Sequence, residues 1–249
     1  CPLVIDTSSA SCGNSRFGCW VCTVVDKDKS MENLIDSGED WMQPLLELRQ
    51  DLKDTQDPEK KLEIRDFKRR DGKVMFFTDG TEKITPGPYK IEFRKEFLKK
   101  LLEAQNKVRK DGPDPTMSLI LEEEIHEIQR IWRVEQGDWE NSVYAIYEEI
   151  TGVNLSSVKE DLGGFTKTEQ DILDGICEKN DVPKLLVSKL LNAEFDSQGM
   201  TRHSKIYPKL GKILSEEWRT YDEIETIKEE LKEKKKKKQQ NEQFSRETK

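Results

Sequence analysis

Four of the five cysteines in this 249-residue chain fall within its first 22 positions: Cys1, Cys12, Cys19 and Cys22. Four thiolates are enough to complete the ligand set of a [4Fe–4S] cluster or of a tetrahedral zinc ion. Zinc ribbons usually present two Cys-x-x-Cys pairs, whereas this chain has one pair and two longer, unequal spacers. The pattern therefore favours a [4Fe–4S] cluster, with zinc as the alternative. A redox disulfide between Cys19 and Cys22 is a further option, but it leaves the other two cysteines without a role.

The residues around the cysteines suit a metal cluster. Arg16 can offset the negative charge of a thiolate-bound cluster, and Phe17 and Trp20 can shield it from water. Such a centre either performs chemistry or only stabilises a small subdomain, and the local sequence is compatible with both roles.

The composition indicates a thin core beneath a highly charged surface, because 37% of the residues are charged and only 34% are hydrophobic. A net charge of -8 argues against a uniformly basic nucleic-acid-binding protein but allows a local basic patch. No apolar run is long enough for a transmembrane helix, so we expect no membrane partner and a reducing, cytoplasmic location. The chain starts on a predicted ligand, Cys1, and we therefore expect it to be the C-terminal part of a longer protein.

The hydrophobic spacing predicts a mostly α chain with short strands and a cysteine-rich loop at its N-terminus. We expect three regions: a cysteine-rich cluster segment over 1–38, a mostly helical region over 39–222, and a charged, disordered tail over 223–249. Strand-like residues occur at 2–5, 21–25 and 74–77. Helices are predicted over 30–35, 41–52, 89–109, 115–132, 139–150, 168–178, 182–191 and 207–214.

A basic stretch lies between the second and third of these helices. Its cations are Arg65, Lys68, Arg69 and Arg70. Clustered guanidinium groups bind phosphate well, so these four residues are candidate DNA phosphate contacts. The alternative is a solvated helix face whose charges are balanced by neighbouring aspartates.

Several strings resemble one family of enzymes: CPLVID, CGNSRFGCWVCTVVDKDKSMENLI, PGPYKIEFRKEFL and a later IWR. They are similar to the DndC sulfurtransferases of bacterial DNA phosphorothioation, which are related to phosphoadenosine phosphosulfate reductases and ATP pyrophosphatases. SRFGCWVCT is the most specific of them. The resemblance implies a [4Fe–4S] cluster on the four N-terminal cysteines and sulfur transfer to the DNA backbone. It also implies a cysteine desulfurase as sulfur donor, and other subunits of a phosphorothioation complex.

The chain departs from that family at its nucleotide-binding signature, Ser-Gly-Gly-x-Asp-Ser, which is missing. The pair Gly163-Gly164 is not followed by Asp-Ser. ATP and Mg²⁺ would thus act only through an N-terminal α/β domain of the adenine-nucleotide hydrolase type, and the short strands here would be its remaining edge. We expect this part alone to be inactive as an enzyme. The alternative hypothesis is a zinc-stapled helical protein-interaction module without catalysis.

Overall fold

The computed structural model describes residues 20–76, 83–155, 167–197, 206–230 and 233, and this part of the chain is mostly helical, as predicted. Its first elements are α1 (Lys29–Asp36), the 3-10 helix η1 (Asp40–Met42), α2 (Gln43–Asp54), α3 (Lys61–Ile64) and α4 (Ile91–Asp111). They are followed by α5 (Glu122–Gln136), α6 (Ser142–Thr151), α7 (Lys167–Lys179), α8 (Lys184–Phe195) and α9 (Ile206–Leu214). None of these helices is long and apolar enough to span a bilayer.

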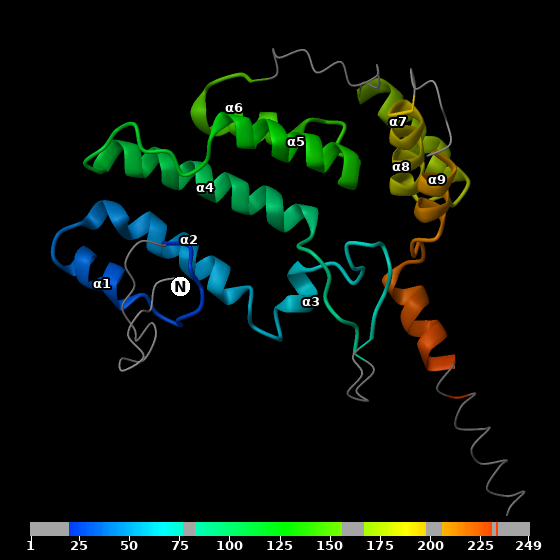
Figure 1. Cartoon of the computed structure of the whole chain (residues 1–249), viewed down its shortest axis with the longest axis horizontal. Coiled ribbons are helices and arrows are strands. Elements are labelled where there is room, and N and C mark those ends of the chain that lie inside the picture. The colour runs from blue at the N-terminus through cyan, green and yellow to red at the C-terminus, as the bar shows by residue number, and fades with distance from the viewer. Residues whose placement is uncertain (1–19, 77–82, 156–166, 198–205, 231–232, 234–249) are drawn as a thin grey trace, which may run out of the picture.

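Helix α4 forms the centre of the larger helical layer, between α2 on one side and the pair α5 and α6 on the other (Figure 1). Its buried side chains Leu98 and Leu102 face α5 and α6, where they meet Ile125, Trp132 and Val143 in the main hydrophobic core. Burial of each such side chain contributes about 1.5 to 3 kcal/mol to stability. The main core is therefore built by helices that are neighbours in the sequence.

A second, smaller core lies at the other end of α4. There Val108 packs with Met31 of α1 and Leu45 of α2. Trp20 and Trp41 are half-buried and pack against these three hydrophobic side chains. This small core fastens the beginning of the described chain to the helical layer.

The C-terminal helices form a separate group at one end of the molecule, where α7, α8 and α9 pack beside one another and α8 contacts α5 (Figure 1). A further helix over 221–230 follows them. Thr220 and Glu223 cap its start, since the Thr220 amide donates to the Glu223 carboxylate (2.7 Å) and the Glu223 amide donates to the Thr220 hydroxyl (3.3 Å). Ile224 is buried. The predicted start of the charged tail, at residue 223, thus lies inside a capped helix.

Two of the strand-like segments lie in the described chain, and neither forms a strand there. Residues 21–25 are irregular, and Val21 and Val24 are exposed. Residues 74–76 make only an isolated antiparallel bridge, between Phe76 and Ile84. The prediction from β-branched residues was wrong at 21–25 because side chains of α2 bind the backbone carbonyls that a sheet would need. The segment 2–5 lies outside the described residues.

The helix predicted to begin at Pro115 begins seven residues later, at Glu122. The reason is Gln105, a buried side chain of α4 whose amide oxygen accepts hydrogen bonds from the backbone amides of Leu119 (2.7 Å) and Ile120 (3.1 Å). These bonds stabilise an irregular segment after α4. Asp114 caps a turn there, through Thr116, rather than a helix.

Candidate functional site: the arginine-held loop and the basic turn

The loop that carries Cys22 is held by a buried arginine of α2. The Arg49 guanidinium is inaccessible to solvent and donates hydrogen bonds to three backbone carbonyls, those of Cys22 (3.2 Å), Asp26 (2.8 Å) and Val25. Burying a cation is costly unless hydrogen-bond acceptors surround it, and here one loop supplies three of them. We call residues 22–26 the arginine-held loop.

Two further side chains near the C-terminal end of α2 hold the same loop. Lys53 donates to the carbonyl of Thr23 (3.2 Å) and forms an ion pair with Asp26 (2.8 Å). Gln56 donates to the Thr23 hydroxyl (2.6 Å). The hydrogen bond and charge of Lys53 lower the pKa of the Asp26 carboxyl, although this carboxyl is almost fully exposed and so contributes little to stability. Arg49 and Lys53 are four residues apart and so lie on one face of α2, and Gln56 follows just beyond the end of this helix.

Of the four predicted cluster ligands, the structure describes only Cys22, a free and half-exposed thiol. Cys1, Cys12 and Cys19 lie outside the described residues, as do Arg16 and Phe17. Within the described ranges, no three His, Cys, Asp or Glu side chains are placed to hold a metal ion. The four-cysteine centre therefore stays a prediction. What the structure adds is a fixed backbone on the C-terminal side of the last predicted ligand.

The basic stretch that follows α3 is a turn and not a helix face. The amide of Arg69 donates to the carbonyl of Lys73 (2.8 Å), and the amide of Gly72 donates to the carbonyl of Arg69 (2.9 Å). Gly72 has a φ of 75°, a left-handed conformation that glycine adopts without steric cost. Asp71 and Gly72, residue types that are common in turns, therefore form a turn here. We call residues 69–73 the basic turn.

The side chains of Arg65 and Lys68 are half-buried and contact aromatic rings of the chain itself. The Arg65 guanidinium lies 4.2 Å from the centre of the Tyr89 ring and donates to the carbonyl of Gly87 (3.1 Å). Lys68 lies over the rings of Phe67 and Trp218, at 5.3 and 5.4 Å. Burial lowers the pKa of the Lys68 ammonium, while nearby carboxylates partly oppose this shift.

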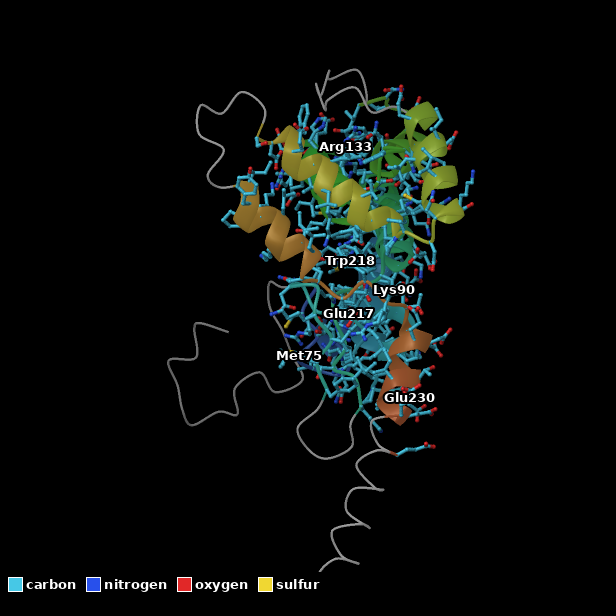
Figure 2. All side chains as sticks on the ribbon, turned by 90° about the vertical axis from the view of Figure 1, so that its right-hand side faces the viewer. Met75, Lys90, Arg133, Glu217, Trp218 and Glu230 are labelled. Atoms are coloured by element: carbon cyan, nitrogen blue, oxygen red, sulfur yellow. The ribbon has the colours of Figure 1, made fainter. Side chains whose placement is uncertain are left out.

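Trp218 joins this region to the C-terminal helices. It lies in the stretch between α9 and the helix over 221–230, beside Glu217 (Figure 2). Lys189 of α8 also lies over its ring (5.5 Å), so the indole interacts with two lysines from distant parts of the chain. The Trp218 indole N–H donates to the carbonyl of Ile213 (2.9 Å), which fixes the ring. Cation–π contacts of this kind contribute about 0.5 to 2 kcal/mol each.

Arg69 and Arg70 remain accessible. Both are exposed, and neither side chain forms an ion pair within the described part of the chain. Arg94 of α4 lies near enough for the charge of Arg70 to contribute to lowering its pKa, after the larger effect of burial. Accessible positive charge is thus concentrated at the basic turn rather than spread over all four predicted residues.

Sequence reasoning missed Arg49 and Trp218. Arg49 is preceded by Leu45 and Leu48 on the buried side of α2, and a cation within an apolar helix face was the available signal. For Trp218 the sequence holds no comparable signal, because its partners are far away in the chain.

Comparison of the chain with protein-family models, with curated proteins and with solved structures gives no match. The resemblance to DNA phosphorothioation sulfurtransferases therefore depends on the sequence strings alone.

Proposed function

We propose that this chain is the cluster-bearing part of a cytoplasmic sulfurtransferase that introduces sulfur into the DNA backbone. The observation that carries the proposal is the four-cysteine pattern within SRFGCWVCT and its flanks. The donor set suits a [4Fe–4S] cluster, which when bound would supply a redox-active, sulfur-rich centre. In this proposal ATP-dependent activation belongs to a separate N-terminal α/β domain, and the sulfur comes from a cysteine desulfurase.

The arginine-held loop supports the proposal on the protein side. A metal ligand needs a backbone of fixed position, because outer contacts orient the ligand and tune the metal. Arg49 and Lys53 provide such contacts directly after Cys22. Their role would be to position this thiolate, whatever the metal.

The basic turn is our candidate for DNA contact. Arg69 and Arg70 are exposed and lack carboxylate partners in the described chain, which leaves their guanidinium groups able to bind phosphate. Arg65 and Lys68 would instead support the turn from inside. The four residues that the sequence offered as DNA phosphate contacts are thereby reduced to two, Arg69 and Arg70.

The metal is tested by purifying the chain without oxygen and measuring iron, acid-labile sulfide, zinc and visible absorption. We expect near-stoichiometric iron and sulfide, which C19S and C22S remove. C177A is the matched control, because Cys177 is a buried thiol of α7 outside the predicted ligand set. One zinc per chain and no visible absorption would contradict the [4Fe–4S] cluster and favour the zinc-stapled interaction module. DNA sulfur incorporation by the complete protein that survives loss of Cys19 and Cys22 would also contradict the mechanism.

The DNA contact is tested by measuring duplex binding as a function of salt. Each lost phosphate contact reduces the slope of log K against log salt by about 1, so the pair R69A and R70A should reduce it by about 2. The control replaces Arg130 and Arg219, which are exposed but paired with Glu127 and Glu217. An unchanged slope in the first variant, or an equal loss in the control, would contradict a specific role of the basic turn.

A further inference from the structure

A cavity of about 700 Å³ lies between the α7–α8 turn and the stretch that follows α9. This volume is within the range of about 300 to 1,000 Å³ that is usual for ligand sites. Its apolar lining consists of Cys177, Val182, Pro183 and Trp218. The bond from the Trp218 indole to the carbonyl of Ile213 fixes one wall, so the cavity does not depend on a mobile aromatic side chain.

Carboxylates dominate the polar lining of this cavity, and among the described residues Lys184 and Arg219 are its only lining cations. The acidic residues of the lining are Asp174, Glu178, Asp181, Glu216, Glu217 and Glu223. We call the whole feature the acidic groove.

Part of this negative charge is neutralised within the fold. Lys184 pairs with Asp174 (2.6 Å), and Arg219 pairs with Glu217 (2.5 Å). Glu216 pairs with Lys189 of α8 (2.5 Å).

Three carboxylates of the groove have no cationic partner among the described residues: Glu178, Asp181 and Glu223, the last of which accepts hydrogen bonds from Thr220. Glu178 and Asp181, at the end of α7, are exposed and form no ion pair or side-chain hydrogen bond with the described residues. Because each lining cation already pairs with a carboxylate, the groove keeps a net negative charge beside its apolar wall. A ligand that fits must offer positive charge and apolar surface together.

Two other classes of ligand, divalent cations and nucleic acid, do not fit this groove. A divalent cation needs several oxygens converging on one point, and no three acidic, histidine or cysteine side chains of the described chain are placed to hold a metal. Nucleic acid would be repelled by the unpaired carboxylates. A lysine or arginine side chain fits, since its aliphatic part packs on apolar surface while its charged head reaches carboxylates.

We propose that the acidic groove docks a basic segment of a partner protein. The stem of an arginine or lysine from that segment lies along Val182, Pro183 and Trp218, and its head pairs with Glu178 and Asp181. The inference needs neither a metal nor DNA, so it stands independently of the sulfurtransferase proposal.

The test is fluorescence anisotropy with a labelled octapeptide of alternating leucine and arginine, against the same peptide with glutamine in place of arginine. We expect the arginine peptide alone to bind, and E178Q with D181N to weaken it about tenfold. Asparagine suits residue 181, whose φ is 53°. The matched control is E229Q with E230Q, which removes two exposed charges from the helix over 221–230 and should change affinity less than about twofold.

Three results would overturn the proposal: equal binding of the glutamine peptide, equal weakening by both double variants, or binding only after removal of residues 234–238. The last result would make the chain's own lysine run the occupant of the groove. Circular dichroism of both double variants separates a loss of binding from a loss of folding.

Discussion

Replacing Arg49 with methionine removes a buried guanidinium and its three hydrogen bonds to backbone carbonyls, while keeping an unbranched apolar stem. Hydrogen bonds to charged groups contribute about 1.5 to 3 kcal/mol each, but water can reach part of the loop and recover some of that free energy. We therefore expect R49M to lower the free energy of unfolding by about 3 kcal/mol, a large share of the 5 to 15 kcal/mol that is usual for a domain.

The measurement is urea unfolding followed by circular dichroism, with R49K and R130M as companions. R49K keeps the charge but cannot reach three carbonyls with one ammonium, and we expect about half the loss. Arg130 is exposed and, within the part of the chain that the structure describes, pairs only with Glu127 of its own helix, so R130M should cost less than about 0.5 kcal/mol. A loss below about 1 kcal/mol for R49M would refute the argument, because the three bonds would then be replaceable by water.

Four further substitutions test other parts of the same structure. A β-carbon added at Gly87 would lie 1.7 Å from the Lys68 carbonyl oxygen, so G87A should lower the melting temperature and reduce the free energy of unfolding by about 3 kcal/mol. Gly175 is a helical glycine with open space around it, so G175A should raise the free energy of unfolding by about 0.5 to 1 kcal/mol. The folded chain lowers the pKa of Lys68 below 10.5, so the unfolded chain holds that proton more tightly and the free energy of unfolding rises with pH just below 10.5. Urea unfolding measured at successive pH values should show this rise for the original chain and not for K68M. The same pH profile for both proteins would contradict the assignment of the rise to Lys68. T220A removes a helix cap and should cost about 1 kcal/mol, seen as faster amide exchange over 221–230 but not in α5.

The helices could largely be predicted from the sequence because local signals determine them. Pro44 lies in the first turn of α2, and Gly38, with a φ of 104°, follows the end of α1, as expected for a residue that stops a helix. The predicted helix over 207–214 agrees with α9 to within one residue. Each of these boundaries depends on residues within one or two turns of it.

The errors came from side chains that act across the fold. Gln105 delays the start of α5, and Arg49 prevents a strand at 21–25, in both cases by binding backbone groups at least 14 residues away in the sequence. The basic stretch was predicted as a unit because its residues are neighbours in the sequence. In the structure, the basic stretch separates into residues that contact aromatic rings and residues that do not. One of the aromatic partners of Lys68, Trp218, lies in the C-terminal third of the chain.

The stacking of Lys68 and Lys189 on Trp218 has a consequence for the order of folding. Contacts within α5–α6 or α7–α8 close short loops, whereas the contacts of Lys68 with Trp218 and of Phe67 with Tyr221 close a loop that contains most of the molecule. We expect these contacts to form last during folding and to open first under stress. W218L should therefore speed unfolding while leaving the refolding rate of the helical layer nearly unchanged.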